Sequence, residues 1–264
     1  MPFLQIDGYV HHYEIDGGKD KPALLFANSL GGDLRIWDGV ASRLLPHFRI
    51  VRYDLRGHGL TEAPPPPYSA DDLARDVGGL LDALEINDAI ICGVSVGGMI
   101  AQAFAVNYPA RARALVLCDT GAKIATAEAW QQRIDKVRAD GVASLVQMTM
   151  ERWFCAGFRE RCALDVRGYS LMLRQTSPDG YVGTCAALRD TDLRQAVTQI
   201  KKPTLVLCGA EDIGTPPELG RELAGSIPGA QFCLIDKAAH LPCIEQPAAV
   251  AERMMEFFRE VKIV

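Results

Sequence analysis

Short hydrophobic runs alternate along most of the chain with segments in which apolar residues recur at helical spacing. The last five or six runs are nearly continuous apolar stretches rather than an alternation of apolar and polar positions. Strands that are buried on both faces, as in a parallel sheet, have this pattern. The predicted strands are Val10–Asp16, Ala23–Ser29, Phe48–Asp54, Ala89–Ser95, Arg113–Thr120, Thr204–Gly209 and Gln231–Ala238.

Segments of helical period lie between these strands. Regular alternation of strand and helix is typical of α/β folds, in which the crossovers are right-handed and helices cover a mostly parallel central sheet on both faces. The predicted helices are Ile36–Leu45, Ala70–Leu84, Gly98–Asn107, Glu218–Ser226 and Ala248–Val261.

One long segment, residues 121–196, interrupts the alternation with helical patterns and no convincing strand. It carries 11 Lys and Arg against 9 Asp and Glu, whereas the remainder carries 17 against 24. Helices inserted between two strands emerge at one end of the sheet, and ligands of open α/β sheets bind at the carboxyl ends of the strands. We therefore expect residues 1–120 and 197–264 to form the core and residues 121–196 to form a helical cap over a site. The alternative is an extra helical layer whose charges are solvated.

Composition narrows the class of protein. With 264 residues, 48% of them hydrophobic, and a formal net charge of -5, the chain has the make-up of a globular protein and lacks the basic surplus of nucleic-acid binders. No apolar run is long enough to cross a bilayer, and the first residues lack the layout of a signal peptide, so we expect a cytoplasmic protein. The eight cysteines form no CxxC pair. We expect reduced, structural thiols and no metal site.

A candidate nucleophile follows one of the predicted strands. Gly93-Val94-Ser95-Val96-Gly97 lies between the apolar run Ala89–Cys92 and the start of a predicted helix. This G-x-S-x-G pattern places a serine on a tight strand-to-helix turn that has no room for side chains at the two glycines. The alternative is a glycine-rich turn with an incidental serine.

A serine hydroxyl needs a base, and the base needs an orienting acid. Of the five histidines, His240 directly follows the last predicted strand, and Asp212 follows the strand before it. Parallel strands send their C-terminal loops to one edge of the sheet, so Ser95, Asp212 and His240 can converge there. Glu211 is the rival orienting acid, and the spacing to Pro216 favours Asp212.

With these features the chain resembles the α/β-hydrolase family over essentially its whole length. The matching elements are Ser95 in its turn, Asp212 in Gly-x-x-Asp-x-x-x-Pro, His240 in the last loop, and Asp54-x-Arg-Gly-His-Gly. The resemblance implies a nucleophile at Ser95, a base at His240 and an orienting acid at Asp212. It also implies that His58 is structural.

The same resemblance implies where an oxyanion hole lies. The backbone N–H groups of Leu30 and Val96 are the two expected donors, and the loss of one such donor typically costs about 3–4 kcal/mol in the transition state. Many relatives begin the first of these loops with His-Gly. Here the residues are Asn28-Ser29, which leaves a backbone donor intact but changes the lining of the site.

A narrower resemblance is to the 3-oxoadipate enol-lactonases of aromatic catabolism. It is carried by residues 28–38 and 52–54 and by two cap segments, residues 122–135 and 175–190. That family opens an unsaturated five-membered lactone bearing an acetate side chain, and it uses no metal and no cofactor. The resemblance therefore implies a small-molecule anionic lactone as the substrate.

A carboxylate on the substrate calls for a cation in a water-excluding site, and the planar fork of arginine suits it. Within the predicted cap, Arg133 lies one helical turn after Trp130 and is our candidate, with Trp153 as an apolar wall. The alternative is that Arg133 is simply solvated.

Three competing functions remain at the level of sequence. The first is another serine hydrolase of the same fold, such as a carboxylesterase or a carbon–carbon bond hydrolase. The second, a haloalkane dehalogenase, is disfavoured because that chemistry uses an aspartate where this chain has Ser95. The third is a binding module without catalysis, although all three members of the Ser-His-Asp set are present.

Overall fold

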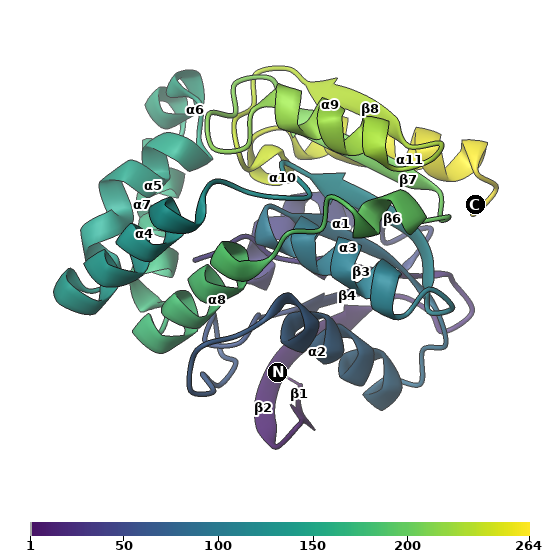
Figure 1. The fold of residues 1–264 in the computed structure, drawn as a ribbon. Helices are drawn as coiled ribbons and strands as arrows, with labels where there is room; N and C mark the ends of the chain where they lie inside the picture. The colour runs from purple at the N-terminus through teal and green to yellow at the C-terminus, as the bar shows by residue number, and fades with distance from the viewer. Residues whose placement is uncertain (1) are drawn as a thin grey trace.

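The computed structural model describes residues 2–264 and contains one eight-stranded sheet in the order β1-β2-β4-β3-β5-β6-β7-β8 (Figure 1). β1 and β2 pair antiparallel, as do β2 and β4, and all the other neighbours pair parallel. The sheet is thus mostly parallel, as predicted. The strands are β1 (Phe3–Ile6), β2 (Tyr9–Asp16), β3 (Ala23–Ala27), β4 (Arg49–Tyr53), β5 (Ala89–Val94), β6 (Ala112–Cys118), β7 (Thr204–Gly209) and β8 (Gln231–Ile235).

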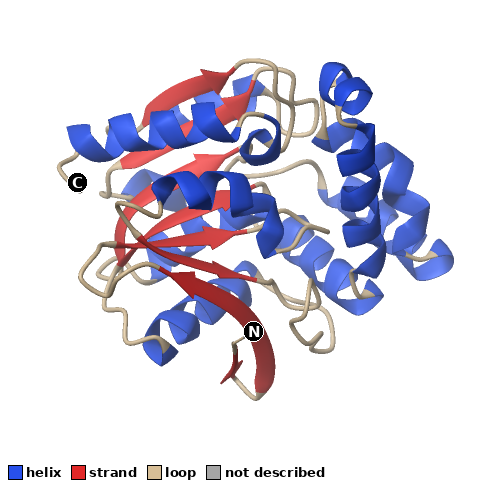
Figure 2. Ribbon diagram, turned by 180° about the vertical axis from the view of Figure 1, so that it is seen from behind, coloured by secondary structure: helices blue, strands red, loops and turns tan. Residues whose placement is uncertain are grey.

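Helices cover both faces of the sheet, as Figures 1 and 2 show from opposite sides. Helices α2 (Ala70–Ala83), α3 (Val96–Asn107) and α9 (Pro217–Ser226) lie on one face, and α1 (Asp38–Leu44) and α11 (Pro247–Glu260) lie on the other. The start of α2 is fixed by a capping box, in which the Ser69 hydroxyl accepts from the Asp72 N–H and the Asp72 carboxylate accepts from the Ser69 N–H. Within the described residues, no helix is long and apolar enough to cross a membrane.

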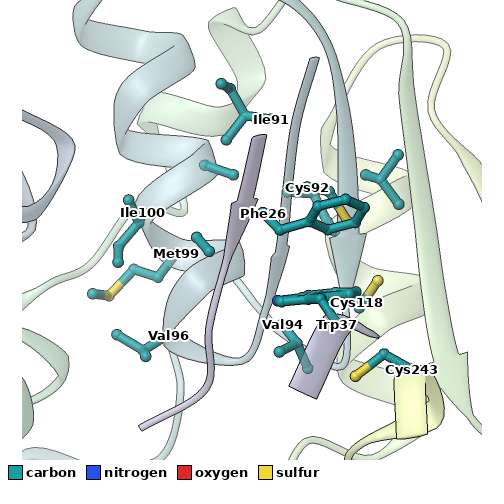
Figure 3. Close-up of a cluster of buried hydrophobic side chains, with 14 of the residues drawn as sticks. Phe26, Trp37, Ile91, Cys92, Val94, Val96, Met99, Ile100, Cys118 and Cys243 are labelled. Atoms are coloured by element: carbon teal, nitrogen blue, oxygen red, sulfur yellow. The ribbon is translucent and has the colours of Figure 1, made fainter. Parts of the chain in front are cut away.

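The centre of the sheet is fully buried, which explains its continuous apolar runs. Every residue of β3, β5 and β7 is buried, and the Phe26 ring of β3 lies 4.7 Å from the Trp37 ring (Figure 3). All eight cysteines are free, and Cys92 and Cys118 pack in this core as small apolar side chains. The prediction that the last strand, Gln231–Ala238, is buried on both faces was wrong, because β8 is an edge strand and Cys233 within it is only half-buried.

The observed elements differ from the predicted ones mainly at their ends. The short strand β1 and the one-turn helix α10 (Pro242–Glu245) were not predicted, since neither is long enough to show a hydrophobic period. The predicted helix 36–45 is a 3₁₀ turn, η1 (Leu34–Trp37), followed by α1. α3 begins at Val96, two residues earlier than predicted, and β8 ends at Ile235, three residues earlier.

Between β6 and β7 the described chain forms helices and loops only, and all but the last of these helices stand beyond the carboxyl ends of the strands, whereas the last one packs against α3 (Figure 1). The Ser177 N–H donates to the carbonyl of Gly57, and a side chain at Gly57 would overlap Gly180, so this segment approaches the core closely. The division into a core and a separate cap stays a prediction. The helices are α4 (Ala127–Asp140), η2 (Val142–Leu145), α5 (Val146–Trp153), α6 (Ala156–Arg161), α7 (Ala163–Gln175), α8 (Pro178–Asp190) and η3 (Ala196–Gln199).

Candidate active site

Ser95 occupies a strained turn between β5 and α3. Its backbone has φ 59° and ψ -118°, a region that non-glycine residues rarely adopt. The turn is held because the Ser95 N–H donates to the carbonyl of Cys118 (2.9 Å) and the Ser95 carbonyl accepts from the Thr120 hydroxyl (2.7 Å). A side chain at Gly93 would overlap the Gly97 carbonyl, and one at Gly97 would overlap the carbonyl of Ala27. The predicted need for both glycines is therefore steric.

Two backbone donors near Ser95 are unused. Val96 is the first residue of α3, where N–H groups have no acceptor within the helix. Leu30 follows β3 in a loop closed by the bond from the Gly32 N–H to the Ser29 carbonyl. Across residues 2–264, neither the Leu30 nor the Val96 N–H has a protein acceptor. Buried N–H groups are usually paired, so these two are available to an oxygen of a ligand.

His240 and Asp212 form a direct pair from two loops at the carboxyl edge of the sheet. His240 follows β8 and Asp212 follows β7, and His240 Nδ1 lies 2.8 Å from Asp212 Oδ2. Since a carboxylate accepts, Nδ1 carries the hydrogen, which leaves Nε2 as the basic nitrogen. Glu211 is exposed and forms no hydrogen bond or ion pair with His240, so the geometry selects Asp212 of the two acids.

Asp212 is held in its ionised form. Burial opposes ionisation, but the neighbouring His240 ring, the Thr215 hydroxyl and the Gly214 N–H together lower the pKa of Asp212 below its usual value. Asp212 Oδ1 accepts from Gly214 N–H (2.7 Å) and Thr215 N–H (3.2 Å), and Oδ2 lies 2.6 Å from Thr215 Oγ1. An anion fixed at Nδ1 both orients an imidazole and stabilises its protonated form.

One cavity of about 70 Å³ is lined by Ser95, His240 and Leu30, whereas Val96 and Asp212 are not among its lining residues. No hydrogen bond joins Ser95 Oγ to His240 in the described part of the chain, although both side chains face the cavity. Catalytic hydrogen bonds are often long without substrate and tighten when it binds. The lining residues are Ser29, Leu30, Ser95, Ile124, Ala125, Trp130, Arg133, Thr149, Arg152, Trp153, Tyr181, Gly214, Thr215 and His240.

The helical segment between β6 and β7 supplies the cationic side of the cavity. Arg133 of α4 faces it, with its guanidinium 5.5 Å from the Trp130 ring and 3.8 Å from the Met148 sulfur. Trp153 is buried and lines the cavity as an apolar wall. Both sequence-predicted residues thus lie at the site.

Arg152 was missed from the sequence. It lines the same cavity, and among the described ion pairs neither Arg133 nor Arg152 has a carboxylate partner. Burial and the positive charge of Arg133 lower the pKa of Arg152. The available signal was helical spacing: Thr149, Arg152 and Trp153 lie on one face of α5 and all three line the cavity.

The remaining histidines of this region are structural in their contacts. His58 is fully buried, and its Nδ1 donates to the Arg56 carbonyl (2.9 Å). Burial lowers the pKa of His58 to about 4, so this side chain is neutral near pH 7. His12 pairs with Asp54 (2.8 Å) but does not line the cavity.

Comparisons with known proteins agree with this geometry. The family model for the alpha/beta hydrolase fold matches residues 22–247. A 3-oxoadipate enol-lactonase of Acinetobacter baylyi is 37% identical over 90% of this chain and 89% of its own length. Among solved structures, the enol-lactonase from Burkholderia xenovorans LB400 has a TM-score of 0.95 at 37% identity, covering 98% of this chain and 100% of that one. An esterase from Thermogutta terrifontis has a TM-score of 0.91 at 28% identity, covering 98% and 97%.

The matched family model spans most of the chain, and the relatives of more than 30% identity are covered almost in full. The mostly parallel sheet and the helices on both of its faces are those expected from the alternation of strand and helix in the sequence. The chain therefore belongs to the α/β-hydrolase family.

Proposed function

We propose that this protein is a serine hydrolase that opens 3-oxoadipate enol-lactone to 3-oxoadipate. The observation that carries the proposal is one cavity faced by Ser95 on its strained turn and by His240, whose Nδ1 is held by Asp212 at 2.8 Å. The identity of 37% to an enol-lactonase supports the choice of substrate within the hydrolase class.

In the first half of the reaction, Ser95 Oγ attacks the lactone carbonyl while His240 Nε2 accepts its proton, and Asp212 stabilises the imidazolium. The N–H groups of Leu30 and Val96 hold the negative oxygen of the tetrahedral intermediate. The ring C–O bond then breaks. The leaving enol oxygen takes the proton from His240, and the acyl group stays on Ser95.

In the second half, His240 takes a proton from water, and the resulting hydroxide attacks the acyl carbonyl. The bond to Ser95 Oγ breaks, and His240 returns the proton to Ser95. The released enol becomes the ketone, so one lactone and one water give one 3-oxoadipate. No step needs a metal or a cofactor.

The substrate carboxylate is recognised by the cap. Arg133 and Arg152 present two guanidinium groups to the cavity, and bringing like charges together is favourable when an anion lies between them. Trp130 and Trp153 give the ring of the lactone an apolar wall. An acidic five-membered lactone matches this combination.

The deciding experiment compares two substrates. Hydrolysis of the enol-lactone is followed by ultraviolet absorbance beside that of a neutral p-nitrophenyl ester. We expect kcat/KM for the lactone to exceed that for the ester by about a hundredfold or more, in line with one charge-assisted contact and a better fit. A general carboxylesterase, the alternative supported by the esterase relative, would favour the ester.

A labelling experiment separates catalysis from binding alone. A fluorophosphonate probe reacts with an activated serine, and we expect it to label the native protein and not Ser95→Ala. A native protein that resists the probe would be a binding module. A protein that is labelled but leaves both esters intact would point to carbon–carbon bond hydrolysis.

A further inference from the structure

Asp119, just after β6, is a buried carboxyl group that the mechanism above does not use. Its side chain is 1% exposed, and its backbone has φ 44°. Oδ1 accepts the Gly209 N–H at 2.8 Å. Oδ2 is buried and has no hydrogen-bond partner among residues 2–264. Such an orphaned oxygen is costly unless it carries a proton that it can donate.

The neighbouring group able to accept that proton is the carboxylate of Asp212. One side-chain atom each of Asp119, Asp212 and Cys208 lies within 4.8 Å of the others, so the two carboxyl groups are close neighbours in the buried interior. Two ionised carboxylates this close in a buried place repel strongly, so the pair holds one proton between them. Carboxylic acids donate short, strong hydrogen bonds to carboxylates.

The surroundings place the proton on Asp119 rather than on Asp212. Asp212 has four polar neighbours that favour its anion, whereas Asp119 accepts from one backbone N–H only. Burial and the charge of Asp212 raise the pKa of Asp119 well above its usual value. The pKa of Asp212 moves the other way.

The other titratable groups facing Asp119 are the thiols of Cys118, Cys208 and Cys243. Burial raises the pKa of Cys208 and of Cys243, and Cys208 Sγ lies 3.6 Å from two carbonyl oxygens to which a thiol can donate. His240, the group that becomes cationic, contacts Asp212. A protonated acid and a protonated thiol are unsuited to a metal, which takes deprotonated ligands.

We propose that Asp119 is a neutral carboxylic acid that donates its proton to Asp212 and thereby positions Asp212 against His240. The pair then carries a single negative charge, which lies on the side facing the imidazole. Asp119 is a positioning residue and touches no substrate. The inference rests on the proposed function in one respect, the role of Asp212 and His240 as a catalytic pair.

The acid limb of the pH profile tests the proposal, because the limb in kcat/KM reports the pKa of the base in the free enzyme. In Asp119→Asn the amide can donate to Asp212 as the acid does, so we expect the limb to stay in place. In Asp119→Leu the donor is lost, Asp212 becomes a stronger acceptor and His240 a stronger base. We expect the limb to move up by about one pH unit and kcat to fall about tenfold.

Two other outcomes for the acid limb would contradict the proposal. If Asp119 is ionised, Asp119→Asn removes a negative charge behind the pair, His240 becomes less basic, and the limb moves to lower pH. A limb that is unmoved in Asp119→Leu means that Asp212 receives no hydrogen bond from Asp119. Either result overturns the proposal.

Infrared spectroscopy gives a readout that needs no activity and no leucine variant. The difference spectrum between the native protein and Asp119→Asn at neutral pH should show the carbonyl band of one protonated carboxylic acid in the native protein. Absence of that band overturns the inference. If neither lactone nor ester is hydrolysed, the proposed function fails, and the infrared band still decides the state of Asp119.

Discussion

At the scale of single residues, the strained conformation of Ser95 depends on its backbone and not on its side chain. The strained φ of 59° is held by hydrogen bonds of the Ser95 N–H and carbonyl, and none of these involves the hydroxyl. We therefore expect Ser95→Ala to retain the melting temperature and to lose about a thousandfold or more of kcat/KM for the neutral ester. Near-normal hydrolysis by this variant would remove the covalent route and leave water activated by His240.

The buried ring of His58 leads us to predict how the free energy of unfolding depends on pH. Its folded pKa of about 4 lies below the ordinary 6.5, so the unfolded chain binds a proton between these values and the native protein does not. The stability that comes from the neutral ring is therefore complete above pH 6.5 and is lost as the pH falls toward 4. This loss reaches about 2 kcal/mol by pH 5. His11, whose pKa is also lowered by burial, acts in the same direction.

The test uses His58→Asn, which keeps a donor for the Arg56 carbonyl and cannot be protonated. Urea unfolding at pH 7 and pH 5 gives the free energy of unfolding of both proteins. We expect the variant to lose less stability than the native protein over this interval. An equal loss in both would mean that His58 does not titrate as a buried ring.

At the scale of elements, the strand-to-helix turn depends on the absence of a side chain at Gly97. A Cβ there would overlap the backbone of Ala27, the last residue of β3, which cannot move aside without disturbing the sheet. We expect Gly97→Ala to lower the free energy of unfolding by about 2–4 kcal/mol. Gly168, exposed within α7 and with nothing near its missing Cβ, is the matched control. Gly168→Ala should raise stability by about 0.5–1 kcal/mol, and equal losses in both variants would contradict the steric account.

Strands could be predicted from the sequence where burial on both faces gives them a continuous apolar run. The strands β3, β5, β6 and β7 lie in the centre of the sheet and show as apolar runs, whereas β1 at the edge carries no such pattern. The pairing of His240 with Asp212 followed from strand order, because parallel strands end at one edge. Arg152 could not be found in the same way, since its place at the cavity depends on how α5 packs in three dimensions.

At the scale of the whole molecule, the segment between β6 and β7 differs in charge from the rest of the chain. The chain has a net charge of -5, yet residues 121–196 carry two positive charges in excess. Arg133 and Arg152 bring part of that excess to the cavity. The electrostatic field of such a cluster of positive charge raises the rate of encounter with an anionic ligand, and salt screens this field. We expect kcat/KM for the lactone to fall as ionic strength rises, with that for the neutral ester unchanged.

Removing one guanidinium separates direct contact with the substrate carboxylate from long-range attraction by the positive charge. In Arg133→Ala we expect KM for the anionic lactone to rise about 10–100-fold, the value of a charge-assisted hydrogen bond, with neutral-ester hydrolysis unchanged. Arg138→Ala is the matched control, because Arg138 lies exposed on the same helix and away from the cavity. Both variants lower the overall charge equally, so a difference between them comes from contact and not from the distant field. If the two variants raise KM for the lactone alike, long-range electrostatic attraction accounts for the preference for the lactone. If Arg133→Ala slows hydrolysis of both the lactone and the neutral ester, Arg133 shapes the cavity and does not recognise the carboxylate.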